Sequence, residues 1–354
     1  MDPIPVAVFG ATGTIGQRFV SLLQDHPRFR IAALCASDRR VDSRYGDAWR
    51  LPDVRLADDV AAMAVEQLSA ANVARRAAVG FSALPAEVAR KLEPEFVEQG
   101  VKVFSNASAH RMDDAVPLLV PEVNADHVAL IERQPTFRNG GFLVTNPNCS
   151  ITGLALPLKP LRDALGVSRA FVATYQALSG AGYPGVPSLD IAGNVIPFIE
   201  REEEKIRTEA KKILGALDGG RVAPAGVEVF ANCARVPVRD GHLEAVSIPL
   251  EEEATAEGVA CLLADFRGVP QRRGLPTAPE RPIIVRPEPD RPQPVLDVDA
   301  GEPAKARGMA ATVGRIRVED GVLRFFVLTH NTIRGGAGGS VLNAELADAM
   351  GYLE

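Results

Sequence analysis

The sequence feature that most restricts the possible folds is a glycine-rich turn near the N-terminus. Gly10, Gly13 and Gly16 follow an apolar run at 6–9 and open a segment with helical periodicity at 15–23. Glycine allows a tight turn and lets a phosphate approach the backbone, and a helix N-terminus offers that phosphate free N–H groups. Such glycines can also serve only to pack a helix on a strand. The strand–turn–helix context favours a dinucleotide site, with contacts from Gly10, Thr12, Gly13, Thr14, Ile15 and Gly16.

The first half of the chain alternates short apolar strands with helical segments. We expect strands at 6–9, 31–35 and 79–82, and helices at 15–23 and 85–98. This alternation is typical of an α/β fold with a doubly wound, Rossmann-type parallel sheet. We assign the sheet to a dinucleotide-binding domain at 1–147, completed by a C-terminal helix within 332–354 whose apolar residues recur on one face.

The pattern changes to longer strands in the second half. They are predicted at 170–177, 227–238 and 242–250, and Asp240-Gly241 predicts a hairpin turn between the last two. We therefore expect residues 148–331 to form an α+β domain with a largely antiparallel sheet. Eight prolines between Pro270 and Pro294 exclude a regular helix or central strand, so this segment is expected to be an irregular surface excursion or an interface arm.

Charge and cysteine content narrow the function classes. The chain has 45 acidic and 39 basic residues, a net charge of −6, and no basic block that could neutralise nucleic-acid phosphates. No stretch has the pattern of a secretory signal or a membrane span, so we expect a cytoplasmic protein that binds neither nucleic acid nor membrane. Four cysteines without a CxxC pair favour free thiols in a reducing compartment, and no metal site is expected.

The turn after the strand at 31–35 bears on the choice of dinucleotide. It reads Ser37-Asp38-Arg39-Arg40, where the adenosine ribose should lie. An aspartate there favours NAD through the ribose hydroxyls, whereas hydroxyl and guanidinium groups favour the extra phosphate of NADP. We favour NADP over NAD, with Ser37, Arg39 and Arg40 as contacts, although a solvated turn would look the same.

Cys149 is the candidate nucleophile. It lies in Asn146-Pro147-Asn148-Cys149, between an apolar strand at 141–144 and a helical run. A helix N-terminus lowers the pKa of a thiol, and the nearby N–H groups can hold an oxyanion. Asn148 has no evident packing role and could donate to an anionic leaving group. Beside a dinucleotide site, this thiol indicates a dehydrogenase that handles an aldehyde or acyl phosphate as a thioester.

His242 is the candidate acid/base. If Asp240-Gly241 is a two-residue hairpin turn, Arg239 pairs with His242, and Arg235 shares its sheet face. A guanidinium can bind a carboxylate through two parallel hydrogen bonds, and an imidazole can transfer the proton that a hemithioacetal gains and loses. A histidine at a sheet edge beside solvated arginines is the alternative.

A helix predicted at 197–217 supplies a candidate carboxylate. Its apolar stripe includes Ile199 and Ile206, and Glu202 or Glu203 falls on the same side. An inward carboxylate needs a partner, such as a substrate ammonium or an arginine. Most of the segment 202–205 is expected to be a solvated helix face.

Over nearly its whole length the sequence resembles the aspartate-semialdehyde dehydrogenase family, particularly its archaeal and fungal branch. The resembling segments are specific in combination rather than singly: Gly10–Gly16, Ser105–Met112, Asn146–Cys149, Gln176–Gly182, Glu202–Lys205, Arg235 with His242, and His330–Gly339. The turn at 37–40 departs from the Ser-Glu-Arg-Ser form of this branch.

The resemblance implies a role for each site residue. In the family pattern Cys149 is the acylated nucleophile, Gln176 orients the acyl group and His242 is the acid/base. The resemblance also implies that Arg235 binds the α-carboxylate of the substrate, that Glu202 binds its α-ammonium group, and that the phosphate is bound by Arg111, Asn148 and Lys205. It places Ser179 and Gly180 near the cofactor and Asn331 near the nicotinamide carboxamide.

The reaction implied by the resemblance is reduction of β-aspartyl phosphate by NADPH to aspartate-β-semialdehyde and phosphate, or its reverse, in lysine, threonine and methionine biosynthesis. Catalysis and dimerisation would belong to 148–331, in a homodimer or homotetramer. Malonyl-CoA reductase and N-acetyl-glutamyl-phosphate reductase are alternatives with related chemistry. A non-catalytic NADP-binding regulator is a further alternative, and it would tolerate Cys149→Ser.

Overall fold

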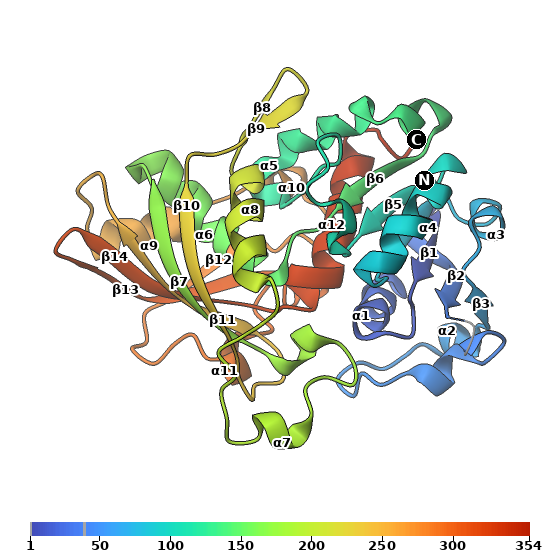
Figure 1. Cartoon of the computed structure of the whole chain (residues 1–354), viewed down its shortest axis with the longest axis horizontal. Helices are drawn as coiled ribbons and strands as arrows, with labels where there is room; N and C mark the ends of the chain where they lie inside the picture. The colour runs from blue at the N-terminus through green and yellow to red at the C-terminus, as the bar shows by residue number, and fades with distance from the viewer. Residues whose placement is uncertain (1, 38–39) are drawn as a thin grey trace.

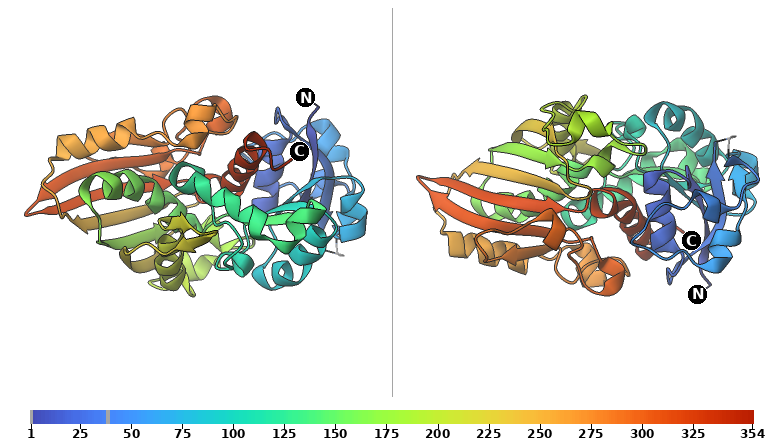
Figure 2. Two further views of the ribbon diagram at one scale, coloured as in Figure 1. Left: turned by 90° about the horizontal axis from the view of Figure 1, so that it is seen from above. Right: turned by 90° about the horizontal axis from the view of Figure 1, so that it is seen from below.

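The computed structural model describes residues 2–37 and 40–354 and contains two six-stranded sheets side by side along the long axis (Figures 1 and 2). The first sheet has the order β3-β2-β1-β4-β5-β6, and every neighbouring pair is parallel. This is the Rossmann order, with its switch point between β1 and β4. Its strands are β1 (Ile4–Phe9), β2 (Phe29–Ala36), β3 (Val65–Gln67), β4 (Val79–Ser82), β5 (Lys102–Ser105) and β6 (Phe142–Thr145). The predicted α/β class is confirmed.

Both faces of the first sheet are covered, as a parallel sheet requires. Alternate residues of β1 pack in opposite directions: Val6 and Val8 join the core with α1 (Thr14–Leu23) and α12 (Gly338–Ala349). Ala7 and Phe9 pack toward α4 (Ala86–Glu98) on the other face. Shorter helices complete this half: α2 (Asp58–Ala62), α3 (Ala70–Ala74), α5 (Pro121–Asn124) and the 3-10 helices Tyr45–Ala48, Ser108–His110, Ala125–Arg133 and Pro135–Asn139.

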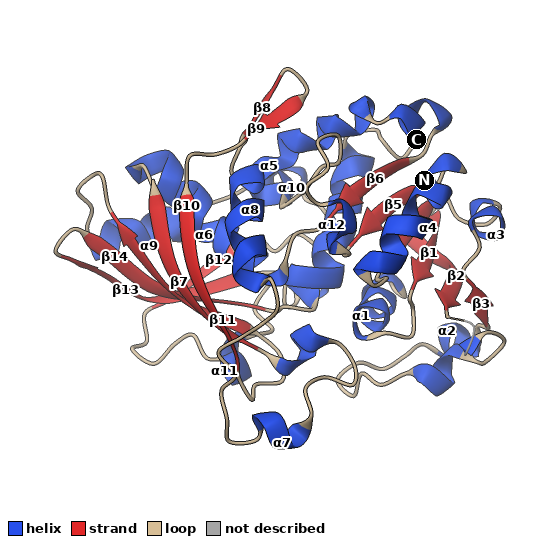
Figure 3. Cartoon of the chain, in the orientation of Figure 1, coloured by secondary structure: helices blue, strands red, loops and turns tan. Residues whose placement is uncertain are grey.

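The second sheet has the order β10-β7-β11-β14-β13-β12 and is mixed, because its two outermost pairings are parallel and the three inner ones antiparallel. Helices α6 (Cys149–Leu165), α8 (Glu202–Ile213) and α9 (Ala256–Asp265) cover one face (Figure 3). The strands are β7 (Arg169–Gln176), β10 (Glu228–Arg235), β11 (His242–Pro249), β12 (Ile283–Arg286), β13 (Ala311–Glu319) and β14 (Val322–Thr329). The opposite face exposes aromatic side chains.

Three sequence expectations about this half were wrong. Strands β10 and β11 do not form a hairpin, because β7 lies between them and pairs with both. The helix predicted at 197–217 is only α8, since Arg201 has a left-handed conformation (φ 58°) and β8 (Ala216–Asp218) pairs with β9 (Arg221–Ala223) just beyond. The proline-rich excursion contains regular structure, namely α10 (Val269–Arg273), the edge strand β12 and α11 (Pro294–Asp297).

The chain returns to the first sheet at its end. Helix α12 follows the π-helical turn Ile333–Ala337, contacts α1 and β5, and lies between the two sheets in Figure 2, where it is dark red. Both termini therefore lie beside the first sheet (Figure 1). The boundaries at 147/148 and 331/332 stay a prediction. Among the described residues no helix is both long and apolar enough to cross a membrane.

Candidate active site

Cys149 is the first residue of α6, and Asn148 caps that helix. The side-chain oxygen of Asn148 accepts hydrogen bonds from the N–H groups of Ser150 (2.9 Å) and Ile151 (3.3 Å). Its amide nitrogen donates to Oε1 of Glu202 at 2.8 Å. Asn148 thus has a structural role as N-cap, and the expectation that it has no packing role was wrong, whereas donation of its second amide N–H to a leaving group stays a prediction.

Cys149 and His242 form the centre of the site. The Cys149 Sγ lies 3.1 Å from Nε2 of His242, and Nδ1 of His242 accepts the N–H of Ala177 at 3.1 Å. Because Nδ1 is occupied as an acceptor, the neutral imidazole carries its proton on Nε2. Burial lowers the pKa of His242 to about 3, with Arg235 as the next cause. The ring is therefore neutral and presents a proton to the sulfur.

The electrostatics of the thiol differ from the sequence expectation. Burial raises the pKa of the Cys149 thiol to about 12, and the carboxylate of Glu202 adds to the rise. Arg111, Arg235 and a backbone hydrogen bond act in the opposite direction without reversing it. The expected lowering of this pKa by the helix N-terminus was therefore wrong, because desolvation outweighs the dipole.

Arg235, Gln176 and His242 lie in one row across three neighbouring strands. Arg235 of β10 pairs with Gln176 of β7. In the antiparallel pair of β7 and β11, Leu243 pairs with Tyr175, so His242 lies opposite Gln176. Directly paired residues share a sheet face, so all three side chains point to the buried side. The shared face of Arg235 and His242 is as expected, although it arises through β7 and not through a hairpin. Nη1 of Arg235 donates to the carbonyl of Ala177 at 2.7 Å.

Of the three successive glutamates at the start of α8, Glu202 faces the site. It is buried, accepts from Asn148, and its Oε2 lies 3.5 Å from Nζ of Lys205. Glu203 instead accepts the N–H of Cys233, and the exposed Glu204 pairs with Arg201. The sequence left this choice open.

Arg111 is held by a residue that sequence reasoning missed. Its Nη1 donates to Oε1 of Glu209 at 2.9 Å, and Nη2 donates to the carbonyl of Asn106 at 2.8 Å. The second oxygen of Glu209 accepts the N–H of Asn148 at 2.7 Å. Glu209 follows Glu202 by seven residues on α8 and therefore shares its face, a spacing that could have identified it.

The glycine turn forms the floor of a second part of the site. Gly10 has a positive φ of 73°, and a Cβ at Gly16 would lie 2.1 Å from the carbonyl oxygen of Gly10, so both positions require glycine. The N-cap of α1, Gly13, offers no side-chain hydrogen bond, which leaves the first-turn N–H groups for an anion.

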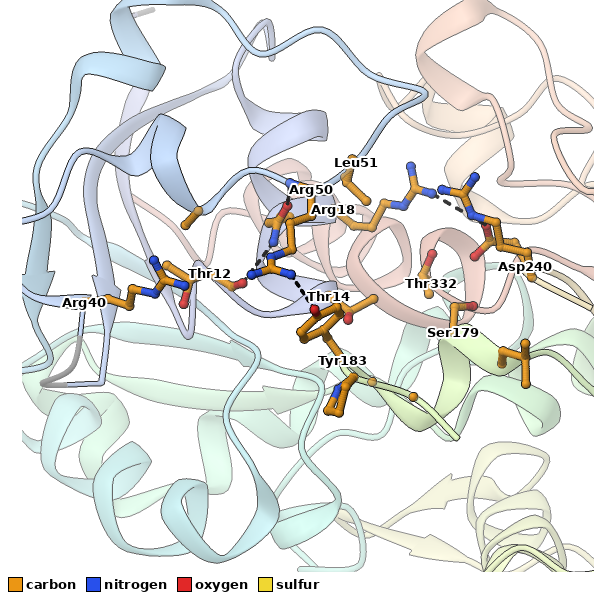
Figure 4. A pocket seen from close by; sticks show the side chains of 17 residues that line it. Thr12, Thr14, Arg18, Arg40, Arg50, Leu51, Ser179, Tyr183, Asp240 and Thr332 are labelled. Atoms are coloured by element: carbon orange, nitrogen blue, oxygen red, sulfur yellow. Dashed lines mark hydrogen bonds and ion pairs between the residues drawn. The ribbon is translucent and has the colours of Figure 1, made fainter. Parts of the chain in front are cut away.

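A cleft of about 450 Å³ extends from this turn between the two sheets (Figure 4). Its lining includes four arginines, namely Arg18, Arg40, Arg50 and Arg239, and the two threonines predicted to contact the cofactor, Thr12 and Thr14. Ser179, Tyr183 and Thr332 also line it. Arg39 lies outside the described residues. Ser37 is exposed, and its carbonyl accepts the backbone N–H of the cleft residue Arg40. Ile15 lies against Gly336.

Ser179, Gly180 and Asn331 connect the cleft with the reactive pair. Nδ2 of Asn331 donates to Oγ of Ser179 at 2.8 Å, and its Oδ1 accepts the N–H of Gly241 at 2.8 Å. Gly180 lies against the site residues, since a Cβ there would be 2.8 Å from Nη1 of Arg235 and 3.1 Å from Cε1 of His242. Ser179 lines the cleft and Gly180 lies against His242, so the segment 179–180 connects the cleft with the cysteine–histidine pair.

Comparisons with known proteins agree with this geometry. Residues 5–131 match the family model of the semialdehyde dehydrogenase NAD binding domain, and residues 158–334 match that of the semialdehyde dehydrogenase dimerisation domain. The chain is 49% identical over 354 residues to the aspartate-semialdehyde dehydrogenase of Methanothermobacter thermautotrophicus, covering 98% of this chain and 99% of that protein. It is 42% identical over 358 residues to the Aspergillus fumigatus enzyme of the same name, with 98% and 97% covered.

A solved structure gives the same result. The crystal structure of the Candida albicans aspartate-semialdehyde dehydrogenase with NADP superposes with a TM-score of 0.89 at 37% identity, covering 99% of this chain and 100% of that chain. Fold, site and matching domains define an oxidoreductase with a nucleotide-binding domain and a dimerisation domain. The chain belongs to the aspartate-semialdehyde dehydrogenase family. The resemblance read from the sequence is confirmed, and a place in amino-acid biosynthesis follows from it.

Proposed function

We propose that the chain catalyses the NADPH-dependent reduction of β-aspartyl phosphate to aspartate-β-semialdehyde and phosphate, and the reverse reaction, through a thioester on Cys149. The observation that carries the proposal is the contact of 3.1 Å between Cys149 Sγ and His242 Nε2, next to the segment 179–180, of which Ser179 lines the cleft. A thiol at a helix N-terminus beside an imidazole is suited to acyl transfer.

The residues of the cleft fit an anionic dinucleotide. The uncapped N-terminus of α1 would receive the pyrophosphate, and the guanidinium of Arg40 would favour the extra phosphate of NADP. Ser37 and Arg39 remain the other predicted contacts of that phosphate. Ser179 and Asn331 would hold the nicotinamide end, where their mutual hydrogen bond orients both side chains. When bound, NADPH supplies the hydride that reduces the acyl carbon. NAD is the less favoured cofactor.

The substrate groups can be assigned by charge. Arg235 keeps guanidinium N–H groups beyond the one that contacts Ala177, and these suit the α-carboxylate. Glu202 is a buried carboxylate next to Cys149 and suits the α-ammonium. Arg111 and Lys205 would bind the phosphate, while Asn148, whose side chain caps α6 and contacts Glu202, would act mainly by positioning both.

In the proposed mechanism His242 acts as a hydrogen-bond donor. As the Cys149 sulfur attacks the acyl carbon, the bond between that carbon and the phosphate oxygen breaks, and the thiol proton leaves with the phosphate, which gives the thioester. Gln176 would orient the acyl group. After the carbon is reduced, the Nε2–H of His242 donates a hydrogen bond to the negatively charged tetrahedral oxygen. As the carbon–sulfur bond breaks, this oxygen becomes the carbonyl oxygen of the aldehyde, and the released Cys149 thiolate takes up a proton from solvent.

Glu202 favours an aspartyl substrate over the related alternatives. A malonyl group has no ammonium, and an N-acetyl group replaces the ammonium with a neutral amide, so neither uses a carboxylate at this position. We expect β-aspartyl phosphate to be reduced, and malonyl-CoA and N-acetyl-glutamyl phosphate to be much poorer substrates, when NADPH absorbance is followed in parallel assays. Efficient reduction of either alternative would overturn the aspartyl assignment.

Cys149→Ala tests the mechanism directly. We expect turnover to fall to no more than a few per cent of wild type, because the thioester cannot form, while the NADP dissociation constant changes little. Mass spectrometry of the wild-type protein with β-aspartyl phosphate should detect an acylated Cys149. A Cys149→Ser variant with normal biological effect and no turnover in any assay would support a non-catalytic NADP-binding regulator instead.

The exposed face of the second sheet supports a homodimer. Phe171 and Phe230 stack with ring centroids 5.2 Å apart on this face, and Tyr175 is exposed beside them. Exposed aromatic side chains on one sheet face are typical of an interface between subunits. We propose that two copies of the chain pair through it, and that a tetramer, if formed, uses a further surface.

A further inference from the structure

The cofactor cleft contains a cation that sequence reasoning did not identify. Of the arginines that line it, Arg18 pairs with Asp53 at 2.8 Å, and Arg239 with Asp240 at 3.5 Å. Arg50 is exposed to the cleft, and within residues 2–37 and 40–354 it has no acidic partner. Its charge is therefore available to an anionic ligand.

The backbone of Arg50 is fixed to the glycine turn. Its N–H donates to Oε1 of Gln17 at 2.7 Å, and Nε2 of the same Gln17 donates to the carbonyl of Thr12 at 2.9 Å. The hydroxyl of Tyr45 donates to the carbonyl of Ala11 at 2.9 Å and anchors the preceding 3-10 helix. The position of Arg50 relative to the start of α1 is thus set by three hydrogen bonds.

This position is electrostatically unfavourable without an anion. The first turn of α1 carries a positive partial charge, and its N-cap Gly13 contributes no side-chain acceptor. A guanidinium that lines the same cleft adds a second positive charge. A phosphate group is attracted by both, because it can accept from the helix N–H groups and from a guanidinium together.

Tyr183 holds the Arg50 side chain from the opposite side of the cleft. The guanidinium carbon lies 4.3 Å from the centroid of the Tyr183 ring, and Nη1 lies 2.5 Å from its hydroxyl oxygen (Figure 4). Tyr183 follows the 3-10 helix Leu178–Ala181, which begins just after β7 of the second sheet, and its side chain is mostly exposed. The pair therefore spans the mouth of the cleft between segments of the two sheets.

We propose that Arg50 binds the cofactor pyrophosphate and that Tyr183 is a positioning residue that keeps the guanidinium over it. The inference rests on the proposed function, because the ligand is the dinucleotide. It adds a side-chain contact to the backbone contacts of the glycine turn. The extra 2′-phosphate remains assigned to Arg40, another cleft residue.

Two cofactor fragments separate these anion sites in calorimetric titrations of the whole protein. ADP contains the pyrophosphate without the 2′-phosphate, and 2′-AMP contains the 2′-phosphate without the pyrophosphate. For Arg50→Met we expect the dissociation constants of ADP and NADP to rise about tenfold, as for an exposed charged contact, and that of 2′-AMP to stay within about twofold. Arg40→Met is the matched control and should weaken 2′-AMP and NADP but not ADP.

Tyr183 variants test the positioning role. Tyr183→Ala should weaken ADP about threefold and leave 2′-AMP unchanged, and Tyr183→Phe, which keeps the ring but loses the hydroxyl that accepts from Arg50, should lie between wild type and Tyr183→Ala. In the Arg50→Met background Tyr183→Ala should have no further effect, because it acts only through Arg50.

The proposal is overturned if Arg50→Met binds ADP as wild type does or weakens 2′-AMP as much as ADP. It is also overturned if Tyr183→Ala weakens 2′-AMP, since that would make Tyr183 an adenosine contact. Arg50→Lys keeps the charge, so its affinity for ADP should lie between those of wild type and Arg50→Met. If Arg50→Lys binds ADP no better than Arg50→Met does, a charge effect is excluded. Wild-type protein that binds neither NADP nor NAD would instead contradict the proposed function.

Discussion

At the scale of single residues, the reactive centre depends on glycines that leave room for it. A Cβ at Gly335 would lie 2.7 Å from the Cβ of Cys149, and one at Gly180 would lie 2.8 Å from Nη1 of Arg235. Neither glycine has the positive φ that would itself require glycine, so the requirement is one of space. The lack of a side chain at these two glycines therefore helps to determine the positions of Cys149 and of the Arg235 guanidinium, in addition to the polar contacts of the site.

Gly180→Ala should therefore lower activity without unfolding the protein. The methyl group displaces Arg235 or His242 by a few tenths of an ångström, and we expect kcat/KM for the semialdehyde to fall on the order of tenfold, because productive geometry in a site is sensitive to such shifts. Gly226→Ala is the matched control, since a Cβ there meets no atom within 4 Å and the backbone φ is unrestrictive. Equal activities of the two variants would show that Gly180 does not set the geometry.

At the scale of single elements, β11 carries two buried ionisable groups on one face. His242 begins the strand, and Glu244 follows two residues later with both carboxylate oxygens buried and without a hydrogen-bond partner in the described part of the chain. Burial raises the pKa of Glu244 well above its ordinary value of 4.5, and Glu202 adds to the rise. Glu244 is therefore protonated in the native state, next to a carboxylate that is used by the site.

This protonation predicts a pH-dependent stability. Between pH 4.5 and the raised native pKa, the folded chain binds one proton more than the unfolded chain at Glu244, so its contribution to stability decreases as pH rises, by up to about 1.4 kcal/mol per pH unit. Glu244→Gln removes this loss. In urea unfolding at pH 5, 6.5 and 8, we expect the variant to gain stability relative to wild type with rising pH.

Glu252→Gln, an exposed change in the loop after β11, is the control and should show no such trend. If wild type and Glu244→Gln keep a constant difference across the pH range, Glu244 is ionised in the native state and the argument fails.

The elements also show how much of the fold could be predicted from the sequence. The strand–turn–helix at 4–23 could be predicted, because the spacing of Gly10, Gly13 and Gly16 is a local steric requirement. The strand partner of β11 could not, because Asp240-Gly241 is compatible with a tight turn, whereas the insertion of β7 between β10 and β11 depends on contacts distant in sequence.

The same distinction holds for the site. Cys149 was identified from its local pattern, whereas His242 was identified from a hairpin that the fold does not contain and from the family resemblance; the two residues lie 3.1 Å apart. The role of Asn148 as the N-cap of α6 could have been inferred, since Asn is a common N-cap residue. The raised pKa of the thiol could not, because it depends on the distant segments that pack around the partly buried Cys149 and on the nearby carboxylate of Glu202.

At the scale of the whole molecule, the site and the exposed aromatic face are two sides of one sheet. Along β7, Gln176 points to the buried site and the preceding Tyr175 to the exposed face, next to the stacked pair Phe171 and Phe230. A partner subunit on the outer face would therefore support the strands that position Gln176 and His242 on the inner face. We therefore expect assembly and catalysis to be coupled through this sheet.

Phe230→Asp should dissociate the assembly. The phenyl ring is about half exposed in the isolated chain (52%). Burying a carboxylate in its place between subunits costs desolvation, so we expect the dissociation constant to rise on the order of a hundredfold or more. Sedimentation velocity at micromolar concentration should show a dimer for wild type and a monomer for the variant. Val295→Asp, at an exposed position on α11, is the control and should leave the wild-type state unchanged.

Activity should follow the state of assembly in this variant. Because the inner face loses support only in the monomer, we expect the specific activity of Phe230→Asp to rise with protein concentration toward the wild-type value, while its cofactor affinity, which depends on the first sheet and the cleft, changes little. A variant that sediments as wild type does would exclude this face as the interface. A monomer with full activity at every concentration would leave the interface in place but exclude the coupling through β7 and β11.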